Sequence, residues 1–143
     1  YKTLQADHSL IPNAVEEILR LETPSCGLWR VVTRDTELAG VAIPKGAMLM
    51  VRFASANRDE KVFSEPEKMD VCRHNAGDNL AFGKGVHFCL GAQLARKELA
   101  VAFAALLERT DNWRLTEGKN SLHHWPNMIL RGLEELHIQF DKR

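Results

Sequence analysis

The pattern of hydrophobic and polar positions predicts two helices, one near the start of the chain and one in its second half, with short segments elsewhere. Within residues 12–21 apolar side chains recur at helical spacing, at Val15, Ile18 and Leu19. Residues 92–109 predict a longer helix, because they contain an almost unbroken apolar run from Leu99 to Leu107. These two segments give the strongest secondary-structure signals in the sequence.

Strand and turn signals lie between the two helices and after the second one. The expected elements before residue 60 are a strand at 30–33, a hairpin at 37–46, a buried strand at 47–53 and a short helix or turn at 54–59. Irregular chain then continues through Asn79. After the second helix we expect a strand at 113–116 and two strands around Gly132. The pattern is typical of an α+β fold.

Composition and charge narrow the class of protein. The 143 residues suggest one domain, and 45% hydrophobic with 27% charged residues is ordinary for a globular protein. A formal net charge of zero gives no electrostatic footprint for nucleic acid or an anionic membrane. The sequence shows no apolar run long enough to span a bilayer. Three widely spaced cysteines favour a reducing, cytoplasmic setting over a disulfide framework.

Candidate chemistry concentrates in residues 80–91, directly before the second predicted helix. Cys89 lies at or just before the N-terminus of that helix, where free N–H groups favour an anionic sulfur by roughly 0.3–1 kcal/mol. Nearby glycines, which permit positive φ and close approach of a ligand, are Gly83, Gly85 and Gly91. The residues alone therefore indicate a thiolate that acts as a metal ligand or as a nucleophile.

This stretch resembles the haem-binding loop of the cytochrome P-450 superfamily of haem-thiolate monooxygenases. The family pattern Phe-x-x-Gly-x-x-x-Cys-x-Gly is matched by Phe82, Gly85, Cys89 and Gly91. The longer bacterial-type pattern is also matched, through Gly83, His87, Leu94, Ala95, Arg96 and Glu98. The resemblance implies that Cys89 is the proximal iron ligand of haem b (iron protoporphyrin IX) and that His87 donates a hydrogen bond to a haem propionate. It implies the C-terminal portion of that fold, with a Glu-x-x-Arg helix, small hairpins, a meander, the cysteine loop, a long proximal helix and a C-terminal β-hairpin.

The same resemblance assigns structural and cofactor roles outside the loop. Glu17 and Arg20 match the Glu-x-x-Arg pair of the family, and Arg73 matches the third member of its buried cluster. Taken alone, Glu17 and Arg20 would be an ordinary surface ion pair. Arg30 matches an arginine that binds a haem propionate, and its other interpretation is an exposed strand residue.

Two further segments correspond to parts of the family that touch substrate. Pro24, Ser25 and Cys26 follow the first helix where the family passes over the haem. Ile129 and Leu130 precede an Arg-Gly-Leu segment like the one that ends the family sequence, and they are equally suited to an ordinary sheet core. Cys26 is expected to be a small buried residue rather than a second ligand.

The resemblance implies an oxidoreductase that inserts one oxygen atom of O2 into a small organic substrate, with electrons from a ferredoxin or flavoprotein. Family members are about three times longer, so we expect residues 1–143 to be the incomplete C-terminal haem-binding portion of such a protein. No segment matches the acidic residue and threonine of the distal helix. We therefore expect the fragment alone to be inactive, to bind haem loosely or not at all, and to self-associate.

Two alternatives from other classes remain open on the residues themselves. One is a non-enzymatic haem-binding or haem-sensing module that uses Cys89 and His87. The other is an enzyme with Cys89 as nucleophile and His87 as base.

Overall fold

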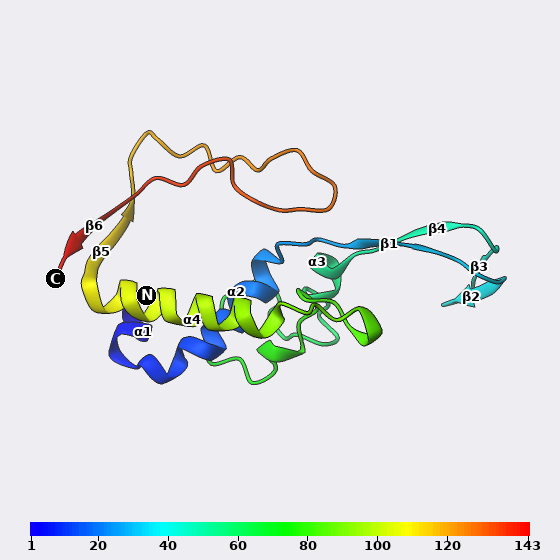
Figure 1. Cartoon of the computed structure of the whole chain (residues 1–143), viewed down its shortest axis with the longest axis horizontal. Coiled ribbons are helices and arrows are strands. Elements are labelled where there is room, and N and C mark those ends of the chain that lie inside the picture. The colour runs from blue at the N-terminus through cyan, green and yellow to red at the C-terminus, as the bar shows by residue number, and fades with distance from the viewer.

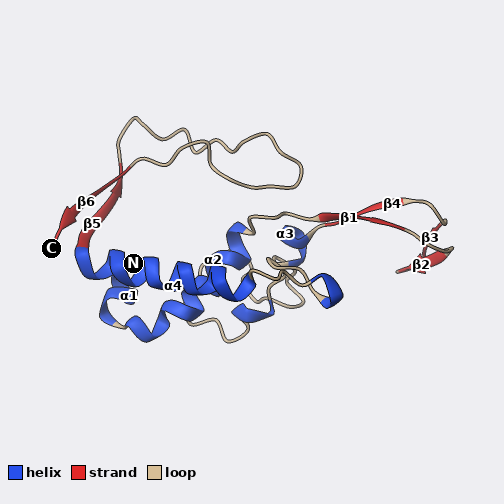
Figure 2. Ribbon diagram, in the orientation of Figure 1, coloured by secondary structure: helices blue, strands red, loops and turns tan.

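The computed structural model describes residues 1–143, in which a layer of helices lies at one end of an elongated molecule (Figures 1 and 2). A long β-ribbon extends from this layer, and the segment before the C-terminus arches above it. The helices are α1 (Lys2–Ala6), α2 (Ile11–Glu22), α3 (Phe53–Ala56) and α4 (Ala92–Arg109). The strands are β1 (Leu28–Val31), β2 (Thr36–Leu38), β3 (Val41–Ile43), β4 (Met48–Val51), β5 (Thr110–Leu115) and β6 (Ile138–Lys142). None of the helices has the length and apolar character that crossing a membrane requires.

The predicted helices are confirmed as α2 and α4, which pack against each other. A proline in the first turn suits the start of α2, and its buried apolar residues form a stripe along one side, while Glu17 and Arg20 on the same helix are buried as well. The hydrophobic core consists of Leu4, Ile11, Ala14, Val15, Leu19, Ala81 and Leu107. The apolar residues of α4 are distributed around all sides of the helix, and only Ala92 and Leu107 among them are fully buried. Much of the apolar surface of α4 therefore remains in contact with solvent.

The strands form three separate antiparallel pairs: β1 with β4, β2 with β3, and β5 with β6. The predicted hairpin is confirmed as β2–β3, and the strand at 47–53 is confirmed as β4. The predicted burial of β4 is wrong, since Met48 is 64% exposed. The two-stranded ribbon formed by β1 and β4 has no further layer packed on it.

Several boundaries at the two ends of the chain also differ from expectation. The five-residue helix α1 was not predicted, because it is too short to show helical periodicity. The strand predicted at 113–116 is β5, which begins earlier, at Thr110. Its pairing with β6 continues past a register shift between Asp111 and Arg114, where Asn112 adopts positive φ (51°). Of the two strands expected around Gly132, the first is wrong, because residues 128–131 make only the isolated bridge Ser25–Leu130. The second lies nearer the C-terminus than expected: Leu133 makes an isolated bridge with His124, and the strand itself is β6, which pairs with β5.

A buried ion cluster joins α2 to the irregular segment between α3 and α4. The Glu17 carboxylate accepts hydrogen bonds from Arg20 (Nε to Oε2, 2.7 Å) and from Arg73 (Nε to Oε1, 3.0 Å). Glu17 and Arg20 are completely buried, and Arg73 is 5% exposed. The two guanidinium groups also donate to backbone carbonyls of the irregular segment, at Asn57, Ser64, Glu65, Pro66 and Lys68. These bonds replace the backbone pairing that a helix or sheet would provide there.

The ion cluster also determines the ionisation of Glu17. Burial alone would raise the pKa of this carboxyl, but hydrogen bonds from Arg20, from the Asp70 N–H and from Arg73 outweigh burial. The pKa of Glu17 is therefore lowered from its ordinary value, and the group stays ionised in the folded protein.

We predict that Glu17→Gln lowers the free energy of unfolding by about 3–5 kcal/mol, because it leaves two buried guanidinium groups without their counter-charge. Urea titration measures the change. Lys68→Gln is the matched control, since Lys68 and Glu65 have the same i,i+3 spacing as Arg20 and Glu17 but are 62% and 70% exposed. The control should cost less than about 1 kcal/mol. Equal losses in the two variants would contradict a special role for the buried cluster.

A second prediction concerns pH. Because the folded pKa of Glu17 is lowered, its stabilisation is present above the pKa of an unfolded glutamate, about 4.3, and is lost as the pH falls through the folded value. The difference in unfolding free energy between the wild type and Glu17→Gln should therefore narrow as the pH falls from about 6 to about 3. Urea titrations across that range measure it, and a difference that stays constant would refute the linkage.

Candidate cofactor site

A cavity of about 310 Å³ lies between the end of α2, the start of β1, α3 and the loop before α4. Half of its lining residues are hydrophobic. The lining residues are Leu19, Pro24, Ser25, Leu28, Arg30, Phe53, Ala81, Phe82, Gly83, Lys84, His87 and Cys89. The cavity is at the small end of the range for ligand sites, which suits one wall of a site rather than a closed pocket.

The backbone of residues 80–91 explains how Cys89 reaches this cavity. Gly83 and Gly85 adopt positive φ (70° and 76°), which lets the chain reverse twice within a few residues. The turns are closed by backbone bonds from Gly83 N to Leu80 O (2.9 Å) and from Cys89 N to Phe82 O (3.0 Å). Cys89 is left exposed, three residues before α4 begins, and is not part of a disulfide.

Arg96 of α4 supports the base of this loop. Its guanidinium lies 4.7 Å from the centre of the Phe82 ring, and it pairs with both carboxylate oxygens of Glu16 on α2. Asn79 donates a further hydrogen bond to the same carboxylate (3.0 Å). The loop that carries Cys89 is therefore held against both long helices.

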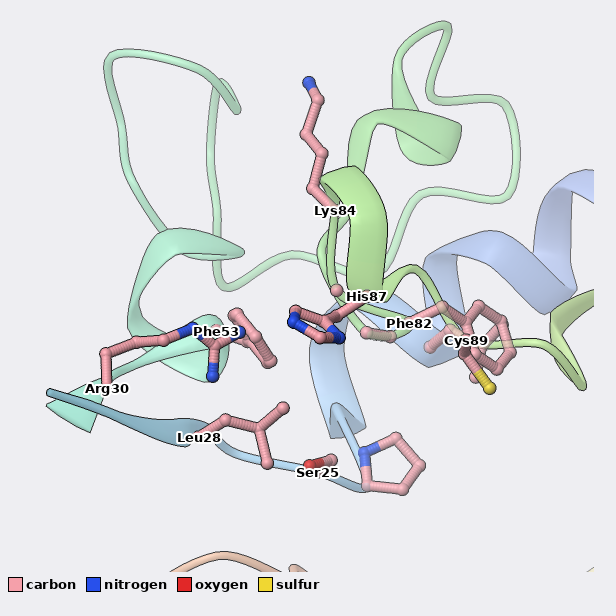
Figure 3. A pocket seen from close by; sticks show the side chains of 12 residues that line it. Ser25, Leu28, Arg30, Phe53, Phe82, Lys84, His87 and Cys89 are labelled. Carbon is pink, nitrogen blue, oxygen red and sulfur yellow. The ribbon is translucent and has the colours of Figure 1, made fainter.

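Figure 3 shows how the polar side chains are arranged around the cavity. Arg30 from β1 and His87 from the loop extend into the same region, beside Phe53, while Lys84 points away from the other labelled side chains. The Cys89 sulfur and the His87 ring point in different directions. The site thus offers one sulfur donor, an apolar wall and two side chains suited to anionic groups. This combination fits a flat apolar ligand with a metal at its centre and carboxylates at its edge.

The structure brings together seven of the cofactor and substrate residues expected from the sequence: Cys89, His87, Arg30, Phe82, Gly83, Pro24 and Ser25. Gly85 and Gly91 belong to the loop but do not line the cavity, and Cys26 is half-buried beside it. Ile129 and Leu130 contact the 25–26 segment through backbone pairing. Leu130 lines a separate cavity of about 440 Å³ with Pro24 and Trp125, so it does not face Cys89.

Sequence reasoning missed three wall residues, Leu19, Ala81 and Phe53, of which Phe53 has the largest side chain. Its position at the end of a predicted strand suggested only core packing, and no local signal distinguishes a core phenylalanine from one beside a ligand. Lys84 was given no role, and its outward direction is consistent with that.

Comparison with known proteins identifies the family of this site. The family model described as cytochrome P-450 matches residues 4–138. A steroid C26-monooxygenase of Mycobacterium tuberculosis is 47% identical over 137 residues, which are 96% of this chain and 37% of that protein. The cytochrome P-450 monooxygenase PikC of Streptomyces venezuelae is 41% identical over 138 residues, which are 96% of this chain and 33% of that protein.

Solved structures agree with the sequence relatives. The substrate-free form of Mycobacterium marinum cytochrome P-450 CYP150A6 superimposes with a TM-score of 0.95 at 35% identity, covering 99% of this chain and 36% of that one. Bacillus megaterium CYP109E1 in complex with corticosterone gives a TM-score of 0.91 at 34% identity, over 96% of this chain and 37% of that one. The chain therefore spans about a third of the length of the proteins it matches.

We predict that Gly85→Ala destabilises the protein by about 1–2 kcal/mol, because an L-residue is strained at this positive φ. Gly77→Ala is the matched control: a Cβ would meet nothing within 4 Å at either glycine, and only Gly85 has positive φ. The control should be neutral or slightly stabilising. Thermal unfolding measures both variants, and equal melting temperatures would count against backbone strain at Gly85.

Proposed function

The chain belongs to the cytochrome P-450 family, and on this premise we propose that residues 1–143 form the C-terminal, thiolate side of a haem site in a monooxygenase. The activity proposed for the whole protein, meaning this segment together with the rest of the family fold, is insertion of one oxygen atom of O2 into an organic substrate. The observation that carries the proposal is the exposed Cys89 at the wall of an apolar cavity, directly before α4.

The residues around Cys89 fit a haem. Gly91 lies beside the Cys89 sulfur, and a Cβ added there would make an ordinary van der Waals contact with it at 3.9 Å. Phe82 and Phe53 supply apolar contacts for the macrocycle, while Arg30 and His87 are placed to bind its propionates. The haem, when bound, supplies the redox chemistry that activates dioxygen, and the Cys89 thiolate donates electron density to the iron.

Glu17, Arg20 and Arg73 have a structural role in this proposal. None of the three lines the cavity, and their hydrogen bonds fix the irregular segment that leads into the cysteine loop. The cluster therefore acts on the haem only by holding the loop in place.

We also propose a small apolar organic substrate, with Pro24 and Ser25 as contacts from this chain. Cys26, Ile129 and Leu130 do not line this cavity, but Ile129 and Leu130 pair with the 25–26 segment through the backbone, so we propose these three as further substrate contacts. Electrons would come from a ferredoxin or flavoprotein. Three free cysteines support a reducing, cytoplasmic setting. Exposed apolar residues on α4, such as Leu94 and Val101, support self-association of residues 1–143 in isolation.

The cysteine-nucleophile alternative is weakened by the geometry of the loop. A base must lie within hydrogen-bond reach of the nucleophile, whereas the His87 ring and the Cys89 sulfur diverge in Figure 3. The divergence also supports the proposed role of His87 as a hydrogen-bond donor to a haem propionate rather than as an iron ligand.

We predict that Cys89→Ser in the whole haem protein abolishes the strongly red-shifted ferrous carbon monoxide band, because the hydroxyl cannot replace a thiolate as iron ligand. Monooxygenase turnover should be lost with it. Cys72→Ser is the matched control, since Cys72 is also exposed and free but lies away from the cavity.

A red-shifted band that survives in Cys89→Ser would overturn the proposed ligand. A wild-type spectrum without that band, together with a six-coordinate form that changes in His87→Ala, would favour the haem-sensing alternative.

A further inference from the structure

Asn57 is a completely buried polar residue that directly follows α3 and has so far been given no function. Its side-chain nitrogen donates to Thr23 Oγ1 (2.8 Å), and its side-chain oxygen accepts from Leu80 N (2.7 Å). The two partners lie 34 residues before it and 23 residues after it. One amide side chain therefore connects the end of α2 with the start of the cysteine loop.

The first arm of this connection leads back to the ion cluster. Thr23 donates its hydroxyl proton to the carbonyl of Arg20 (2.7 Å), and the backbone carbonyl of Asn57 accepts from the Arg20 guanidinium (2.8 Å). Thr23 is completely buried as well. The position of Asn57 is thus set by the same arginine that pairs with Glu17.

The second arm leads forward to the sulfur. Asn57 holds the N–H of Leu80, and the carbonyl of Leu80 accepts from Gly83 N (2.9 Å). Two residues after Leu80, the carbonyl of Phe82 accepts from Cys89 N (3.0 Å). The amide that begins the loop is therefore linked to the amide of the cysteine through the hydrogen bonds that close the turns between them.

We propose that Asn57 is a positioning residue for Cys89: through the N–H of Leu80 it sets where the cysteine loop begins and so where the sulfur lies. The spectroscopic effect expected from this inference rests on the proposed haem-thiolate function. The positioning itself is a property of the protein backbone and is measurable without haem.

The test compares three variants of the whole haem protein. Asn57→Ala removes the acceptor for Leu80, whereas Asn57→Asp keeps an acceptor oxygen and loses the donor to Thr23. Thr23→Val removes the hydroxyl that accepts from the Asn57 side-chain nitrogen, and it leaves the bond from Leu80 N to the Asn57 side-chain oxygen. Asn57→Ala deletes the hydrogen bonds to Leu80 and to Thr23, and Thr23→Val deletes those to Asn57 and to the Arg20 carbonyl. Each variant thus loses two buried hydrogen bonds, so a merely structural role would give them similar effects.

We expect Asn57→Ala to transfer most of the ferrous carbon monoxide absorption from the red-shifted thiolate band to a shorter wavelength. Asn57→Asp and Thr23→Val should keep the red-shifted band. Amide hydrogen exchange provides the second readout: exchange at Leu80 should accelerate about tenfold in Asn57→Ala, as expected for loss of one hydrogen bond, and should stay near the wild-type rate in the other two.

Similar spectra and similar Leu80 exchange in Asn57→Ala and Thr23→Val would overturn the inference. Should Asn57→Ala not fold, an ester in place of the Leu80 amide deletes the same hydrogen bond without touching Asn57, and it must give the same spectral shift; because the ester has no Leu80 amide proton, the spectrum is its only readout. A wild-type protein without the thiolate band refutes the proposed function, and Leu80 exchange then decides the positioning role alone.

Discussion

The structure depends on one shared carboxylate. Glu17 lies in the core with no exposed surface and neutralises two guanidinium groups, one three residues away on the same helix and one 56 residues away. Burying this many charges is unfavourable unless every group is paired, and no buried side-chain nitrogen or oxygen is left without a partner. The donors left over after pairing bind carbonyls of the irregular segment. That segment is therefore ordered without a helix or a sheet of its own.

Order in the irregular segment is what gives the cysteine loop a defined start. Asn57, Asn79 and Arg96 each bond the loop or its base to a different part of the helical layer. Positive φ at Gly83 then turns the chain so that Cys89 lies at the cavity wall. The reactive atom is exposed, yet the loop that carries it is closed by backbone hydrogen bonds from Gly83 N, Phe88 N and Cys89 N. This separation of an accessible sulfur from a rigid support suits a ligand that must bind iron in one geometry.

Local signals in the sequence were sufficient for the parts of the fold that local interactions determine. Helical periodicity located α2 and α4, and turn residues located the β2–β3 hairpin. The motif around Cys89 located the loop, which supplies half of the residues that line the cavity. Burial of β4 was predicted wrongly and the pairing of β5 with β6 was not predicted, because both depend on which segments lie alongside in space. The connections made by Asn57 span 23 and 34 residues and likewise leave no trace in a local pattern.

The central claim is that the sulfur of Cys89 binds the haem iron. X-ray absorption at the iron edge of the whole haem protein tests it most directly, because the fine structure identifies the atoms bonded to the metal. The account predicts one sulfur neighbour in addition to the porphyrin nitrogens, and loss of that sulfur when residue 89 alone is changed to serine. An iron coordinated only by nitrogen and oxygen in the unmodified protein would contradict it.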